Sequence, residues 1–156
     1  MDNREEAENK YLTFVVGDEI YGLDILHIKE IIGIQKITRI PEQPYFIRGV
    51  INLRGNVIPV MDARLRFGME PKPYDERSCT VVINSRDMLV GFIVDTVAEV
   101  LEIPPENVED ARSTGEKDKC LRGLGKVGDE VKILLEAEPL LFGHLNSPKS
   151  LEHEVS

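Results

Sequence analysis

Short β-rich runs broken by glycine-containing turns recur along the whole chain, and they constrain its fold more than any other feature. The clearest is GVINLRGNVIPV at residues 49–60, where two β-rich arms flank Arg54-Gly55-Asn56 and glycine can supply the positive φ of a tight turn. Further hairpins are predicted around turns at 17–19, 85–87 and 128–130, and the run at 96–103 ends against two prolines. A series of short hairpins predicts an all-β fold.

Helical signals are few and short. Residues 24–33 combine helix-like apolar spacing with β-branched residues, which predicts a brief helical turn leading into a strand. Short helices are predicted near Ala63–Phe67, followed by a glycine stop, and near Pro139–Phe142. The polar stretch from Glu106 to Lys119 is predicted to be an exposed loop.

The two halves of the chain resemble each other in the same order. Residues 21–32 align without gaps on residues 90–101, and residues 49–68 align on residues 123–143 with one inserted residue. We therefore predict two similar β units of about five strands each, closed into small barrels because closure removes exposed sheet edges. Coincidence between short hairpins is the alternative.

Charge and hydropathy exclude several classes of partner. A formal charge of -9 and a pI near 4.9 disfavour nucleic acid and anionic lipid. Residues 1–10 lack the apolar segment of a signal peptide, and no apolar run approaches the roughly 18 residues that cross a bilayer. We expect a cytoplasmic protein without direct membrane insertion, with a disordered tail at 1–10, one folded region at 11–143 and a polar tail at 144–156.

Motifs for chemistry are weak or absent. Residues 123–128, GLGKVG, match the glycine pattern of dinucleotide sites, but a β-rich run follows them where such a site needs a helix, which favours a turn. The three histidines are dispersed, and Cys79 and Cys120 form neither a redox pair nor a zinc ligand set. We expect no metal, no cofactor and no catalytic residues; an unrecognised enzyme is the alternative.

Four segments resemble one known family. They are F-x-x-G-D-E-x-Y-G at 14–22, T-R-I-P at 38–41, G-V-I-N-L-R-G-N-V-I-P-V at 49–60 and G-F-I-V-D-x-V at 91–97. The chain thus resembles the CheW-type chemotaxis coupling proteins from about Tyr11 to Gly143. The resemblance implies two five-stranded SH3-like barrels with a shared hydrophobic seam, and a function without cofactor or chemistry.

The resemblance also implies partners. Such proteins bind the regulatory domain of the CheA-type histidine kinase and, in a groove near the seam, the cytoplasmic tip of chemoreceptors. By the same resemblance, the candidate residues for the receptor groove are Ile28, Arg54, Val94, Val97 and Val100, and those for the kinase interface are Leu26, Glu30 and Ile31. We expect the isolated protein to be a monomer. A small β-barrel module that binds a ligand or peptide outside chemotaxis is the alternative function.

Two finer expectations concern residues that the repeat relates. Ile28 and Val97 are equivalent in the two halves, and we predict that both are partly exposed at the seam rather than fully buried. The family resemblance further implies that Glu30 and Arg54 form an ion pair. In the second half, Glu99 matches Glu30, but the residue that matches Arg54 is Gly128. The duplicated fold therefore does not require this pair for its assembly.

Overall fold

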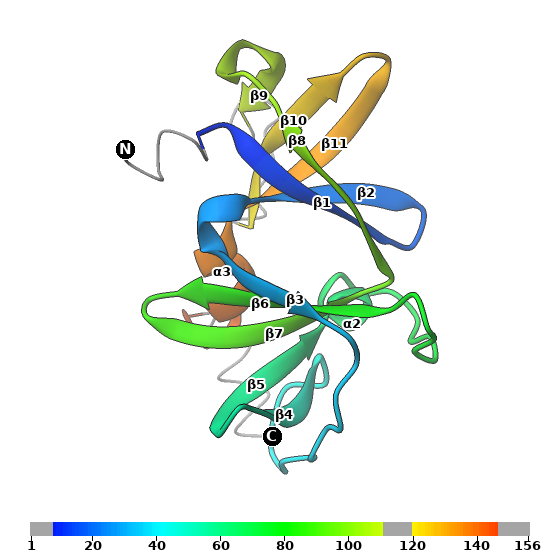
Figure 1. Ribbon diagram of the computed structural model, residues 1–156, viewed down its shortest axis with the longest axis vertical. Helices are drawn as coiled ribbons and strands as arrows, with labels where there is room; N and C mark the ends of the chain where they lie inside the picture. Colours follow the sequence, from blue (N-terminus) through cyan, green and yellow to red (C-terminus); the bar gives the residue numbers. More distant parts are fainter. Residues whose placement is uncertain (1–7, 111–119, 147–156) are drawn as a thin grey trace.

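The computed structural model describes residues 8–110 and 120–146, and most of its regular structure is β-strand, as predicted (Figure 1). The strands are β1 (Lys10–Val16), β2 (Glu19–Asp24), β3 (Ile28–Ile32), β4 (Ile47–Leu53), β5 (Asn56–Asp62), β6 (Cys79–Ser85), β7 (Met88–Val94), β8 (Thr96–Glu102), β9 (Val108–Asp110), β10 (Leu121–Val127) and β11 (Glu130–Leu135). The helices are short: η1 (Ile25–His27), α2 (Ala63–Arg66), η2 (Pro105–Asn107), α3 (Ala137–Phe142) and η4 (Gly143–Asn146).

The strands form two sheets, each curled into a small barrel. The five-stranded barrel has the order β3-β6-β7-β5-β4, and the six-stranded barrel has the order β8-β1-β2-β11-β10-β9. The chain crosses between them twice, once through η1 into β3 and once at Asp95 into β8. The first hairpin, β1–β2, therefore belongs to the barrel that the C-terminal strands build, in the upper half of Figure 1.

The strand orders confirm the predicted duplication. Reading β3-β6-β7-β5-β4 against β8-β1-β2-β11-β10 pairs every strand with its sequence repeat. The predicted one-residue insertion in the second hairpin is wrong, because both hairpins close with two turn residues: Leu53 faces Asn56, and Val127 faces Glu130. The second half is longer only beyond the hairpin, where α3 exceeds α2.

The six-stranded barrel gains its sixth strand, β9, from the stretch that was predicted to be a loop. Residues 105–110 form η2 and β9 instead, and β9 pairs with β10; residues 111–119 lie outside the described part. Close backbone approach explains this addition, because a Cβ on Gly123 would lie 2.5 Å from the Glu109 carbonyl oxygen. The five-stranded barrel has the same approach at Gly49, whose Cβ would lie 2.2 Å from the Thr38 oxygen, beside a single bridge from Thr38 to Val50.

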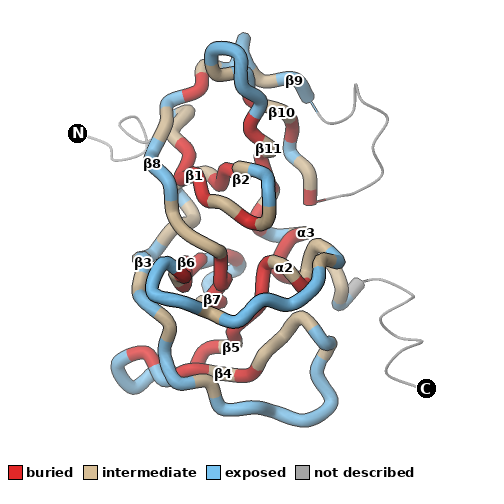
Figure 2. The backbone as a smooth tube through the Cα atoms, turned by 90° about the vertical axis from the view of Figure 1, so that its right-hand side faces the viewer, coloured by how far each residue is buried: buried red, intermediate tan, exposed pale blue. Residues whose placement is uncertain are grey.

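The largest apolar cluster lies between the two barrels. It combines buried residues of both sheets with the helix α3, and Phe14 and Phe92 meet edge to face with ring centroids 5.9 Å apart. Smaller clusters fill each barrel separately. Figure 2 shows buried backbone continuing through the middle of the molecule. The hydrophobic seam that the family resemblance implied is therefore the main core, and it joins the barrels into one unit.

The predicted helices lie close to the observed ones. The helical turn before β3 is η1, α2 ends at Arg66 rather than Phe67, and α3 begins two residues earlier than predicted, at Ala137. Regular structure extends slightly past both predicted domain bounds, from Lys10 to Asn146, while 1–7 and 147–156 lie outside the described residues. None of the described helices has the length and apolar composition needed to cross a membrane.

Candidate functional site

An ion pair joins β3 to the β4–β5 turn of the five-stranded barrel. Arg54, in the β4–β5 turn, donates from Nη2 to Oε2 of Glu30 on β3, which confirms the expected pairing. β3 and β4 are the two edge strands of this sheet, so the pair links one edge strand to the turn that follows the other. The Arg54 side chain is 67% exposed and that of Glu30 24%, so solvent screens much of their attraction.

The backbone at Arg54 is unusual for a residue with a side chain. Its φ is +50°, in the left-handed region that favours glycine. In the equivalent turn of the six-stranded barrel this position is Gly128, with φ +60°. That barrel therefore closes with glycine at the turn, and an arginine is not a requirement of the fold.

Exposed apolar side chains line the segment next to this ion pair. Leu26 in η1 and Ile31 on β3 are both exposed, and they flank Glu30 in the sequence. Asp24 caps η1 by accepting a hydrogen bond of 2.9 Å from the Leu26 amide, which fixes where this segment turns outward. Of the three kinase-interface candidates, Glu30 and Ile31 lie on the edge strand β3, and Leu26 lies in η1, which leads into it.

One edge strand of the six-stranded sheet is β8. Val100 on this strand is exposed, and Val97 is half-buried against the seam core. The Thr13 hydroxyl secures the edge at a β-bulge by donating to the Glu99 carbonyl at 2.7 Å and accepting from the Glu99 amide at 3.1 Å. Figure 2 shows β3 and β8 following one another along one side of the molecule.

Two expectations about burial have different outcomes. Ile28 and Val97 are both half-buried and pack against the seam core, which confirms their predicted partial exposure. Val94 is 2% exposed, so its assignment to an accessible groove is wrong. The position of β7 explains this burial, because it is the central strand of its sheet and all of its residues from Val90 to Val94 are buried.

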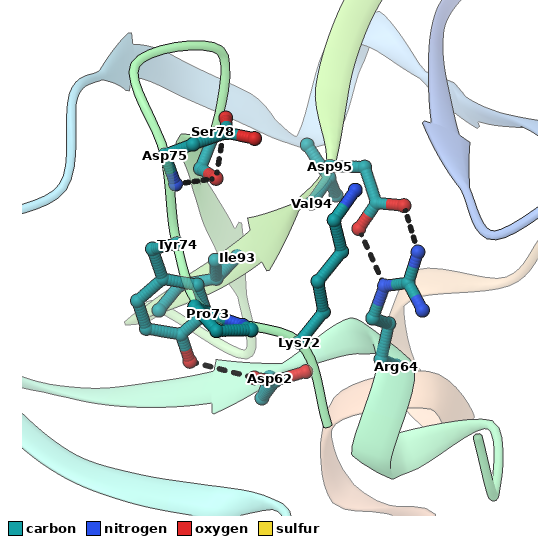
Figure 3. A pocket seen from close by; sticks show the side chains of 10 residues that line it. All are labelled: Asp62, Arg64, Lys72, Pro73, Tyr74, Asp75, Ser78, Ile93, Val94 and Asp95. Carbon is teal, nitrogen blue, oxygen red and sulfur yellow. Dashed lines mark hydrogen bonds and ion pairs between the residues drawn. The ribbon is translucent and has the colours of Figure 1, made fainter. Parts of the chain in front are cut away.

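A polar cluster that the sequence did not reveal lies at the second crossover between the barrels (Figure 3). The Asp95 carboxylate accepts hydrogen bonds from Arg64 Nε at 2.9 Å, from Arg64 Nη2 at 2.7 Å and from the Gly17 amide at 2.9 Å. Burial alone would raise the pKa of Asp95, but the hydrogen bonds and charge of Arg64 and the Gly17 bond outweigh it, so the pKa lies below its usual range. The aspartate in the 91–97 motif was the only sequence signal.

A small pocket lies beside this cluster. Figure 3 shows its lining, which consists of Asp62, Arg64, Lys72, Pro73, Tyr74, Asp75, Ser78, Ile93, Val94 and Asp95. The Tyr74 hydroxyl donates to Asp62 at 2.6 Å, and burial together with this bond raises the pKa of Tyr74. Asp62 also caps α2. The polar groups of the pocket are largely engaged with one another, which suits a structural role better than ligand binding.

The sequence predicted neither a metal site nor a nucleotide site, and the described residues bear on both predictions. Within 8–110 and 120–146, no group of three or more His, Cys, Asp or Glu side chains is placed to hold a metal ion. The glycines at 123–128 lie on β10 and in its turn, and the strand β11 follows them. A helix N-terminus for a pyrophosphate is therefore not formed after these glycines.

Comparison with known proteins gives consistent results. A family model described as a CheW-like domain matches residues 10–142. The chemotaxis protein CheW of Klebsiella aerogenes is 38% identical over 139 residues, which cover 88% of this chain and 84% of the relative, and that of Helicobacter pylori is 33% identical over 141 residues, covering 90% and 84%. The crystal structure of the scaffolding protein TtCheW from Thermoanaerobacter tengcongensis superposes with a TM-score of 0.78 at 34% identity, covering 85% of this chain and 91% of that one.

Proposed function

Since the chain belongs to the CheW-like family, we propose that it is a non-catalytic cytoplasmic adaptor that couples the cytoplasmic tips of chemoreceptors to the regulatory domain of a CheA-type histidine kinase. The observation that carries this proposal is the exposed Glu30–Arg54 pair beside the apolar edge of β3. A solvated pair of this kind stabilises a fold by only about 0 to 1 kcal/mol. Its presence is better explained by a contact with a partner.

An adaptor needs two separate binding surfaces, and two of the edge strands, β3 and β8, are equivalent in the duplicated fold. Ile31 on β3 and Val100 on β8 occupy equivalent positions and are both exposed. Open edges provide unpaired backbone groups as well as apolar side chains, which suits them to protein contacts. We assign the β3 edge, with Leu26 and Glu30, to the kinase.

The receptor tip is assigned to the seam beside the second edge. Ile28, Val97 and Val100 provide apolar surface there, and Arg54 provides charge next to it. Val94 is not part of this proposal because it is buried. Each contact can be modest, since an array of receptors and kinases raises the effective concentration of every partner.

The alternative of a small ligand-binding module fits less well. Ligand sites usually present a few polar groups into an apolar cavity. In the pocket of Figure 3, the carboxylates of Asp62 and Asp95 are instead engaged by Tyr74 and Arg64. The exposed strand edges favour a protein partner.

Binding of the purified chain to a kinase regulatory domain and to a receptor cytoplasmic fragment, separately and together, tests the proposal. We expect Ile31→Ser to lose the kinase and keep the receptor, and Val100→Ser to lose the receptor and keep the kinase. Val131→Ser is the matched control, because Val131 is exposed to a similar degree on β11, away from both edges. A parent chain that binds neither partner, or a control that behaves like the two variants, would refute the proposal.

A further inference from the structure

Apolar packing holds the two barrels together along the seam. Directional polar contacts that span the seam add a further constraint on their relative orientation. One such group is already described. Arg64, from α2 of the five-stranded barrel, engages Asp95 at the crossover (Figure 3), and Asp95 accepts from the amide of Gly17 in the β1–β2 turn of the six-stranded barrel.

A second group spans the seam in the opposite direction. Arg86, in the β6–β7 turn of the five-stranded barrel, donates to Glu138 Oε1 from Nε at 2.9 Å and from Nη2 at 2.5 Å. Glu138 lies on α3, which follows β11 of the six-stranded barrel. The Arg86 guanidinium also lies 5.1 Å from the centre of the Phe142 ring on the same helix.

The two groups are related by the internal repeat. The helix α3 corresponds to α2, since each follows the last strand of equivalent hairpins, and the β6–β7 turn corresponds to the β1–β2 turn. Each helix therefore reaches the first hairpin turn of the other barrel. Arg66 of α2 also donates to the Leu140 carbonyl of α3 at 3.0 Å, which links the two helices directly.

The backbone at Arg86 gives an independent reason to look for a role of its side chain. Its φ is +56°, whereas the equivalent position in the other barrel is Gly17, with φ +65°. A left-handed backbone conformation is unfavourable for residues with a Cβ, and glycine does not pay this energetic penalty. Strain of this kind persists where the side chain does something that glycine cannot.

We propose that Arg86 and Glu138 are positioning residues that, together with the Arg64–Asp95–Gly17 group, set the angle between the two barrels. The consequence for binding rests on the proposed function: the β3 and β8 edges lie on different barrels, so their relative orientation determines whether both partners can be held at once. The side chains of Arg86 and Glu138 are 44% and 56% exposed, so added salt weakens this contact.

The angle can be measured on the isolated chain by pulsed electron paramagnetic resonance. In a Cys79→Ser, Cys120→Ala background, spin labels on cysteines introduced at Asn56 and Asp129 report the distance between the hairpin tips of the two barrels. Both tips are exposed, so the labels leave the seam untouched. The measurement needs no receptor or kinase, and its result is therefore independent of the proposed function.

Two variants of one turn separate the ion pair from the backbone. Arg86→Gly removes the pair and relieves the strain, while Asp87→Gly relieves the same kind of strain at φ +58° and keeps the pair. We expect Arg86→Gly and Glu138→Gln to broaden and shift the distance distribution, and Asp87→Gly to leave it as in the parent. The two altered variants should bind each partner singly but lose joint binding.

Either of two outcomes would overturn the proposal. An unchanged distribution in both Arg86→Gly and Glu138→Gln would show that the pair does not set the angle. Equal broadening in Asp87→Gly would assign the effect to the turn backbone instead. Melting curves of all three variants, followed by circular dichroism, verify that each is folded at the temperature of the distance measurement.

Discussion

Replacing Asp95 by Asn should destabilise the protein by removing the charge on which three hydrogen bonds converge. Asn can still accept with its carbonyl oxygen, but its NH2 group would face the Arg64 guanidinium in either orientation, and in one of them the Gly17 amide as well. The substitution keeps the size of the side chain. Any loss of stability therefore reports electrostatics and hydrogen bonding rather than packing.

The expected magnitude follows from the burial of the pair. The Arg64 and Asp95 side chains are 20% and 19% exposed, which places them between a solvated pair, worth about 0 to 1 kcal/mol, and a fully buried pair, whose disruption costs about 3 to 5 kcal/mol. We expect a loss of about 2 kcal/mol in the free energy of unfolding. For a chain of 156 residues this loss lowers Tm by roughly 4 to 8 °C.

The effect should depend on pH in a defined direction. The pKa of Asp95 is lowered in the folded protein, so the carboxylate stabilises the fold at any pH above its unfolded pKa of about 3.9. That contribution is lost as the pH falls from there through the folded pKa. The stability difference between the parent and Asp95→Asn should be full at neutral pH and shrink progressively below about pH 4.

Urea unfolding monitored by circular dichroism is the suitable assay, because the chain has no tryptophan. Asp18→Asn is the matched control, since Asp18 is an exposed carboxylate whose charge also acts on Arg64. We expect this control to change stability by less than about 0.5 kcal/mol. An Asp95→Asn variant as stable as this control, or a difference that persists unchanged into acid, would refute the reasoning.

Three further predictions follow from burial and close approach. Gly49→Ala should prevent or severely weaken folding, because its Cβ would lie 2.2 Å from the Thr38 oxygen, whereas Gly33→Ala, with open space around it, should melt like the parent. Val94→Thr should lower the free energy of unfolding by about 1 to 3 kcal/mol in urea titrations, since it buries a hydroxyl. Val97→Thr should melt nearly normally but weaken receptor binding in a pull-down, because Val97 is half-buried at the seam; equal melting of the two valine variants would contradict this contrast.

Local features of the fold were predictable from the sequence. Hairpins with two-residue turns leave a strong signal, because positions such as Gly55 and Gly128 adopt a positive φ that few residues tolerate. The duplication was also visible, since equivalent strands keep the same pattern of apolar residues. Tertiary pairing was not: β1 pairs with β8, and no local signal indicates so distant a partner.

In the candidate site, too, some features could be predicted from the sequence and others could not. Glu30–Arg54 was expected from a family resemblance, but the Asp95 cluster was missed because Arg64 and Gly17 lie 31 and 78 positions away. The continuous apolar run of β7, buried from Val90 to Val94, contained the information needed to place Val94 inside. Lys132 shows a limit of such patterns, because it is buried at the position equivalent to the core residue Ile58 and directs its ammonium to Glu130.

Kinase activity in a reconstituted mixture of receptor fragments, kinase and this chain tests the adaptor function most directly. The parent chain should bring the kinase under receptor control. Arg54→Ala and Glu30→Ala should each fail to do so while melting almost as the parent, because their pair is largely solvated. Arg54→Lys should recover only part of the activity, since an ammonium cannot reproduce the planar guanidinium. Full coupling by Arg54→Ala, or a loss of more than about 2 kcal/mol of stability in either alanine variant, would contradict the account.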